Sequence, residues 1–254
     1  MCKHTIFLTN DFVVHKSFVA LHVVHTGFEN GKLPKYVLDK LNTLLADQGD
    51  FSVQCLTTSS ETWESVVQYD RYFESMYCIE YKGEEEINDF VNIIKANKVL
   101  TAQDIAKFVL SKVECTQLKL QKLVYFCYAD YLAKTGKTII SEKPVPYTYG
   151  PVFESLWQEY KKYHDCPIPA DTSQRRQNIV LSRYYAADNK LEVYSSFVDT
   201  INKYGQCTAS QLVDLTHREN SPWSVARNFG MSTIDAETIK AKHKIEELQK
   251  NSQT

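Results

Sequence analysis

His217 is the side chain whose sequence context is most suggestive of chemistry. It follows Thr216 and precedes Arg218 and Glu219 at the expected end of a helix, where the helix dipole favours a protonated imidazole. Glu219 or a buried backbone carbonyl would fix the tautomer of the ring. The position also suits a structural histidine whose hydrogen bonds hold down the turn of residues 220–223, and we favour this second interpretation.

The other reactive residues make poor catalytic or metal sites. A nucleophilic pair of Cys127 and His217 needs the thiol in a solvent-accessible, electropositive position, whereas Cys127 lies on the apolar face of an expected helix. His22 and His25 would be neighbours on a helix, but metal binding needs three or four ligands and no further ligand spacing is present. The sequence has no GxSxG, HExxH, P-loop or GxGxxG motif. We therefore predict no enzyme, no metal site and no cofactor.

Composition and charge restrict the class of partner. With 43% hydrophobic and 24% charged residues, the chain of 254 residues has the composition of a folded globular protein. Residues 1–98 carry nine Lys and Arg against fourteen Asp and Glu, and the remainder carries twenty against seventeen. Neither part has the dense basic stripe that phosphate binding requires, so we do not expect nucleic acid as a partner.

Cysteine usage and hydropathy indicate a cytoplasmic protein. The seven cysteines are odd in number and none stands in a CxxC motif, which fits reduced thiols. The first residues do not resemble a signal segment, and no apolar run approaches the roughly 20 residues of a membrane span. We expect a cytoplasmic location without membrane attachment.

Residues 1–97 are expected to form a small α+β domain, whose role the sequence does not reveal. A proline able to open a helix at Pro34, and apolar residues at helical spacing after Gly83, indicate two helices. Short β-favouring segments with partial alternation indicate strands. These strands are expected at residues 5–8, 51–56, 65–69 and 76–81.

Residues 98–254 are expected to form a mainly helical domain, which makes the chain α+β overall. Residues 117–136 are apolar on most sides, as in a buried central helix. Residues 143–150 hold two prolines and read as extended, and Pro151 then suits the first turn of a helix. The other expected features are capping pairs at Thr101/Asp104 and Thr208/Gln211, a stop at Gly136, helices at residues 191–204 and 235–249, and an exposed loop at residues 164–178.

Polar residues interrupt the apolar pattern of the expected central helix. Lys119 and Lys122 are three residues apart and so lie roughly on one face, either as a basic contact for an acidic partner or as a solvated stripe. Gln121 and Tyr125 are neighbours one turn apart. This second pair is expected to hold the extended segment by hydrogen bonds.

Tyr147, Tyr149 and Trp223 are the aromatic candidates for a surface role. The two tyrosines alternate along the extended segment, so both point to one side of it. They either cover the central helix or anchor a partner, a role that tyrosine often has at interfaces. Trp223 follows Pro222, and its side chain is expected to pack onto the core and cover it.

Three sequence blocks resemble the Panacea domain, also called the SocA-like antitoxin domain, over roughly residues 102–250. The blocks are LKLQKLVYFCYADYLAKTGK, VPYTYGPVFESLWQEY and QLVDLTHRENSPW, in that order. The matching residues are Lys119, Leu120, Gln121, Lys122, Leu123, Tyr125, Phe126, Tyr147, Tyr149, Gly150, Pro151, Val152, Leu215, Thr216, His217 and Trp223.

The resemblance implies a mostly helical antitoxin of a type II-like toxin–antitoxin system, often found in prophages. Such a domain neutralises a cognate protein toxin, encoded by an adjacent gene, by direct binding. Two alternatives stay open: an adaptor that delivers the toxin to an ATP-dependent protease, and a DNA-binding autorepressor using residues 206–218, or another phage accessory protein. The resemblance leaves the chemistry of the toxin and the stoichiometry open. The candidate partner-binding residues are Lys119, Gln121, Lys122, Tyr125, Tyr147, Tyr149, Gly150, Pro151, His217 and Trp223.

Overall fold

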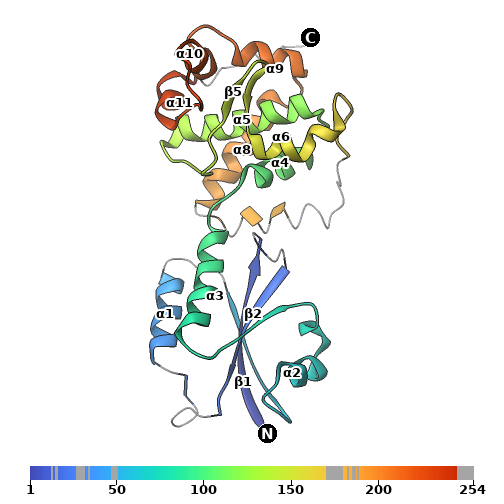
Figure 1. The fold of residues 1–254 in the computed structure, drawn as a ribbon, viewed down its shortest axis with the longest axis vertical. Coiled ribbons are helices and arrows are strands. Elements are labelled where there is room, and N and C mark those ends of the chain that lie inside the picture. The colour runs from blue at the N-terminus through green and yellow to red at the C-terminus, as the bar shows by residue number, and fades with distance from the viewer. Residues whose placement is uncertain are drawn as a thin grey trace, which may run out of the picture. The chain divides into compact units, whose positions relative to one another are not determined.

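The computed structural model divides the chain into two compact units, Met1–Lys98 and Val99–Thr254 (Figure 1). The first contains a four-stranded sheet with helices, and the second is mainly helical. The expected α+β class is therefore confirmed. No helix among the described residues is long and apolar enough to cross a bilayer. The structure describes residues 1–12, 14, 17–26, 32–33, 35–46, 51–169, 180–181, 183–184, 187 and 189–244.

The first unit is a sheet covered on both faces. Its strands lie in the order β3-β1-β2-β4, with β1 antiparallel to both β2 and β3, and β2 parallel to β4. Helices α1 and α3 cover one face and α2 covers the other (Figure 1). The elements are β1 (Cys2–Asp11), β2 (Ser17–Val24), α1 (Lys35–Ala46), β3 (Ser52–Thr58), α2 (Trp63–Tyr69), the 3-10 turn η2 (Arg71–Phe73), β4 (Tyr77–Glu80) and α3 (Glu84–Asn97).

Side chains of β1 alternate between two separate apolar cores. Phe7 packs with residues of α1 and α3, whereas its neighbours Ile6 and Leu8 pack with Val66 of α2. Successive side chains of a strand point to opposite faces, so a strand with both faces covered is apolar almost throughout. This explains why Ile6, Phe7 and Leu8 are apolar in succession at the centre of β1.

The sequence-based assignment of helices and strands in this unit needs two corrections. Residues 65–69 form part of the helix α2 and not a strand, because Thr62 caps the helix by accepting a hydrogen bond from the backbone N–H of Ser65. The strand β2 was not expected, since both of its faces are covered and its sequence lacks alternation. The helix expected to open at Pro34 begins at Lys35, and Pro34 itself lies outside the described residues.

Buried histidines connect three strands of this sheet. Nδ1 of His4 lies 2.7 Å from Nε2 of His22, and Nε2 of His4 lies 2.8 Å from the Thr58 hydroxyl. His25 instead bonds the hydroxyl of Thr5 at 2.7 Å. The picture of His22 and His25 as neighbours on a helix is therefore wrong, because His22 belongs to β2 and His25 follows it. Within the described residues, no three His, Cys, Asp or Glu side chains are grouped as a metal site would require.

Acidification is expected to destabilise the first unit through this histidine pair. Burial lowers the pKa of His22 from 6.5 to about 4, and burial also lowers the pKa of His4. The unfolded chain therefore binds more protons below pH 6.5, and stability is lost as the pH falls from 6.5 towards 4. For His22 alone, the free energy of unfolding should fall by about 2 kcal/mol from about pH 7 to about pH 5. Native-state hydrogen exchange of the β1 amides measures this loss, and equal stability at both pH values would contradict it.

The second unit is built around one central helix, α5 (Figure 1). Every residue from Leu120 to Leu132 is buried, and α4, α6, α8, α9 and α11 all contact this helix. The expectation of a buried central helix is confirmed. The elements are α4 (Ala102–Leu110), α5 (Gln117–Thr135), β5 (Val145–Tyr147), β6 (Gly150–Val152), α6 (Glu154–Tyr160), the 3-10 turn η3 (Lys161–Tyr163), α8 (Lys190–Tyr204), α9 (Ala209–Thr216), α10 (Pro222–Asn228) and α11 (Ala236–Lys242).

Local signals place most of these helix ends correctly. Both capping boxes are present, Thr101 with Asp104 and Thr208 with Gln211, and Gly136 ends α5 in the left-handed conformation with φ of 72°. The helix expected to start at Pro151 begins instead at Glu154, because Pro151 belongs to the strand β6. The helix expected at residues 235–249 ends at Lys242, because His243 has an extended backbone. Residues 170–178 of the expected loop and residues from 245 onward lie outside the described residues.

Candidate partner-binding site

A short hairpin, β5–β6, brings most of the candidate residues together. Tyr147 pairs with Gly150, so the hairpin turns through Thr148 and Tyr149. It packs against α5, α9 and α10, and Figure 1 shows β5 near α9 and α10. An isolated two-stranded hairpin is marginally stable in water, so the surrounding helices must hold this one in place.

Gln121 and Lys122 of α5 bind the second strand and the residue after it. The Gln121 side chain accepts a hydrogen bond from the backbone N–H of Phe153 at 3.0 Å and donates to the carbonyl of the same residue at 3.1 Å. The Lys122 ammonium donates to the carbonyl of Pro151 at 2.9 Å. The expected structural role of Gln121 towards this segment is confirmed.

His217 and Trp223 bind the first strand and the turn. Nε2 of His217 lies 3.0 Å from the carbonyl oxygen of Thr148, and Nδ1 lies 2.7 Å from that of Val213. Nε1–H of Trp223 donates to the carbonyl of Tyr147 at 2.8 Å. His217 is therefore structural as expected, but its long-range bond holds the hairpin and not the turn of residues 220–223. Trp223 packs against the core from a partly buried position.

Gly150 permits the side chains of Thr216 and Lys122 to approach the hairpin closely. Its φ is 103°, a conformation that L side chains rarely adopt, and a Cβ there would lie 2.7 Å from the Thr216 hydroxyl oxygen and 2.8 Å from Cε and Nζ of Lys122. Sequence reasoning missed the role of Thr216 in this contact. The glycine itself was a signal, since a glycine inside a strand often marks a close approach.

Of Lys119 and Lys122, only Lys122 departs from both interpretations of their spacing. Lys122 is fully buried, so it is neither a surface contact nor a solvated stripe, and burial lowers its pKa to about 7. Lys119 is half-buried in the first turn of α5, where its backbone N–H donates to Thr116. Packing on all sides of α5 explains the difference, because Lys122 can reach only the hairpin.

Tyr125 does not bind the hairpin. Its side chain is 2% exposed, and its hydroxyl has no hydrogen-bond partner in the part of the chain that the structure describes. The expectation that Tyr125 helps Gln121 to hold the extended segment is therefore wrong. Tyr125 lines a separate pocket, whose other walls include Phe126 and Tyr204.

Tyr149 is the exposed aromatic residue of the hairpin. It is 69% exposed, whereas Tyr147 is half-buried and donates from its hydroxyl to Glu154 at 2.9 Å. Tyr149 thus does not cover the central helix. The thiol of Cys127, the nucleophile considered above, is fully buried on α5, and burial raises its pKa. The arrangement leaves the Tyr149 ring exposed and offers no accessible thiol at position 127.

Two further contacts, with the hairpin and with the residue before it, were not expected from the sequence. The backbone N–H of Ile234 donates to the carbonyl of Pro144 at 2.7 Å, and Arg227 lies 3.4 Å from the carbonyl of Pro146. Neither contact has a sequence signal, because a carbonyl acceptor is present at every residue.

Comparison with known proteins identifies the central part of the second unit. Residues 120–224 match the model of the family described as antitoxin SocA-like, Panacea domain. The matched range includes most of α5, the hairpin, and the side chains of Gln121, Lys122, His217 and Trp223, whereas Arg227 lies beyond it. The expected resemblance is confirmed over this range, which is narrower than residues 102–250. No curated protein and no solved structure matches the chain.

Proposed function

From this match to the SocA-like antitoxin domain, we propose that the second unit neutralises a protein toxin by binding it directly. The observation that carries the proposal is the exposed Tyr149 on a hairpin whose backbone is fixed by Gln121, Lys122, His217 and Trp223. A surface that is already ordered loses little conformational entropy on binding. Tyrosine is among the side chains that contribute most to protein interfaces.

The proposed mechanism is occlusion of the toxin's active surface in the cytoplasm. The cognate toxin is the product of an adjacent gene, and the antitoxin acts without a cofactor and without chemistry of its own. Binding protects the cell by mass action: an antitoxin in excess over a nanomolar dissociation constant leaves very little free toxin. The hairpin tip, Thr148 and Tyr149, is the proposed centre of the contact.

Replacing Tyr149 with alanine is expected to weaken toxin binding about 100-fold, or about 2.7 kcal/mol, as loss of a central aromatic anchor does. Folding should be unaffected, because the side chain is exposed. The measurement is calorimetric titration of the purified adjacent gene product, together with growth rescue on co-expression. Tyr69→Ala is the matched control, since Tyr69 of α2 is 67% exposed, and it should leave both readouts unchanged. Equal affinity of the Tyr149 variant and the wild type would refute the hairpin tip as the contact.

The same co-expression distinguishes occlusion from proteolytic delivery. In hosts that lack the major ATP-dependent proteases, rescue should persist under occlusion and disappear if the chain is an adaptor. An adjacent gene product that is harmless alone and does not associate with the chain would refute the antitoxin proposal. A salt-sensitive gel shift with operator DNA would favour the autorepressor instead.

A further inference from the structure

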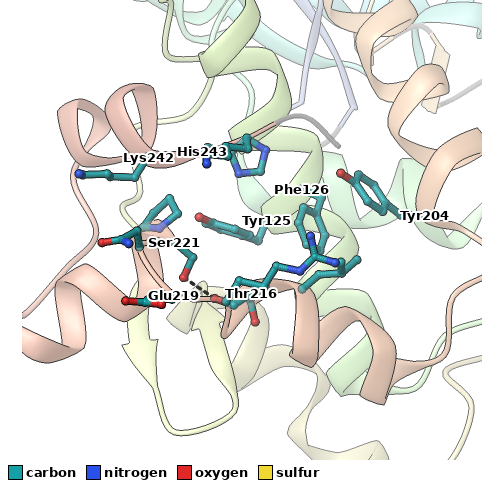
Figure 2. A pocket seen from close by; sticks show the side chains of 13 residues that line it. Tyr125, Phe126, Tyr204, Thr216, Glu219, Ser221, Lys242 and His243 are labelled. Carbon is teal, nitrogen blue, oxygen red and sulfur yellow. Dashed lines mark hydrogen bonds between the residues drawn. The ribbon is translucent and has the colours of Figure 1, made fainter. Parts of the chain in front are cut away.

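A pocket on the second unit lies between α5, α8, the segment after α9 and the end of α11, and its volume is about 200 Å³. Tyr125, Phe126 and Tyr204 provide aromatic walls. Figure 2 shows the Tyr125 ring reaching from α5 into the space bounded by Ser221 and His243. None of the contacts that hold the hairpin uses this ring.

The Tyr125 hydroxyl is an unused donor in this pocket. The side chain is 2% exposed, and its oxygen is shielded from solvent with no hydrogen-bond partner among the described residues. Burial raises the pKa of Tyr125 well above its ordinary value, so the group remains an O–H donor. A buried donor without an acceptor destabilises the free protein. It is therefore a group that an incoming acceptor would satisfy.

The charges around the pocket favour an anionic acceptor. Exposed Lys242 and Lys244 line it, against one exposed acid, Glu219. The nearby carboxylate of Asp130 is already engaged on both oxygens, at 2.6 Å from Nε2 of His243 and 3.0 Å from the Thr200 hydroxyl. The remaining balance at the mouth of the pocket is positive.

The size of the pocket decides what kind of anion fits. Sites for drug-sized ligands measure about 300–1,000 Å³, whereas this cavity of about 200 Å³ accepts a single side chain. A carboxyl-terminal residue would bring its own side chain and backbone with its carboxylate, and so needs more room. We propose that this pocket binds the carboxylate of one aspartate or glutamate side chain of the protein partner, with Tyr125 as hydrogen-bond donor. The partner's identity as a protein rests on the proposed function.

The test uses the full chain, labelled with ¹⁵N, and small probes of defined chemistry. N-acetyl-glutamate α-amide, which carries only a side-chain carboxylate, should shift the amide signals of residues 216–222 and 242–244 with millimolar affinity. N-acetyl-glutamine α-amide should bind at least ten-fold more weakly. N-acetyl-alanine, which carries a terminal carboxylate, and inorganic phosphate should leave these signals unchanged. Equal shifts with any of these three would overturn the assignment to a carboxylate side chain.

Two tyrosine variants separate binding from folding. Tyr125→Phe should weaken the glutamate probe at least ten-fold while its melting temperature stays at or above that of the wild type, since the lost hydroxyl has no internal partner. Tyr184→Phe is the control, because the Tyr184 hydroxyl donates to the carbonyl of Asp104 at 3.1 Å outside the pocket; it should melt lower and bind the probe normally. The proposed role of the Tyr125 hydroxyl would be contradicted if Tyr125→Phe bound the glutamate probe as the wild type does. It would also be contradicted if Tyr125→Phe melted at a lower temperature than the wild type, as the control should.

Growth rescue then connects the pocket to the partner. Reduced rescue by Tyr125→Phe supports the inference. Full rescue by this variant, despite lost probe binding, means that the partner does not use the pocket, and leaves the proposed function intact. Failure of the wild type to rescue contradicts the proposed function alone, because the probe titration does not depend on it.

Discussion

Replacing Gly150 with alanine is expected to lower the free energy of unfolding of the helical unit by about 4 kcal/mol. A side chain at a φ of 103° costs about 1–3 kcal/mol in backbone strain. The added Cβ would also lie within 2.8 Å of Lys122 and Thr216, and such overpacking costs a further 1–3 kcal/mol or so. Neither neighbour can withdraw easily, since Lys122 is fully buried and Thr216 is 4% exposed.

Gly136→Ala is the matched control for this substitution. Gly136 also has a positive φ, of 72°, but a Cβ there meets nothing within 4 Å. The free energy of unfolding of Gly136→Ala should be about 1 kcal/mol lower than that of the wild type, from the backbone conformation alone. Urea unfolding followed by the fluorescence of Trp157 and Trp223 measures both variants. Equal losses would mean that crowding against Lys122 and Thr216 contributes nothing.

The stability of the helical unit is expected to rise with pH through the titration of Lys122. Burial lowers the pKa of this lysine from 10.5 to about 7. Between these values the unfolded chain holds a proton that the folded chain has released, so the free energy of unfolding increases as the pH is raised. From about pH 6 to about pH 10 this one group should contribute about 4 kcal/mol.

Lys122→Met isolates this contribution, because methionine has similar length and no charge. The free energy of unfolding of the wild type minus that of the variant should rise from about pH 6 to about pH 10. The contributions of other titrating groups cancel in this difference. The variant also leaves the carbonyl of Pro151 without its donor at every pH, which changes the difference by a constant amount. Urea titrations at several pH values give the difference. A difference that is constant with pH would show that the folded and unfolded chains bind this proton equally.

The fold was predictable where local signals act alone. Capping pairs such as Thr101 with Asp104, and the apolar character of residues 117–136, gave helix positions that the structure confirms. Residues 65–69 were assigned wrongly because Val66 and Val67 are β-branched, a weak preference that a cap at Thr62 and tertiary packing override. The hairpin turn was missed, because Gly150 and Pro151 were interpreted as the start of a helix and not as the end of a turn.

Most of the side chains that hold the hairpin were named as candidates from the sequence, but their contacts could not be predicted. The side chains of Gln121, His217 and Trp223 bind main-chain groups, and a main-chain acceptor has no sequence signature. The sequence does not distinguish Lys119 from Lys122, because both lie on roughly the same face of α5. Only the packing around α5 makes Lys119 half-buried and Lys122 fully buried. The unpartnered hydroxyl of Tyr125 is likewise visible only once its neighbours are placed.

The hairpin is held through its main chain, so the contacts that position it do not depend on the side chain at its tip. His217 and Trp223 bind the backbone carbonyls of Thr148 and Tyr147. Every amino acid has such a carbonyl oxygen. The residue at position 149, whose side chain points into solvent, can therefore be exchanged without disturbing these contacts. If the hairpin tip contacts the partner as proposed, the domain can acquire a new target by a change at the tip while its framework stays the same.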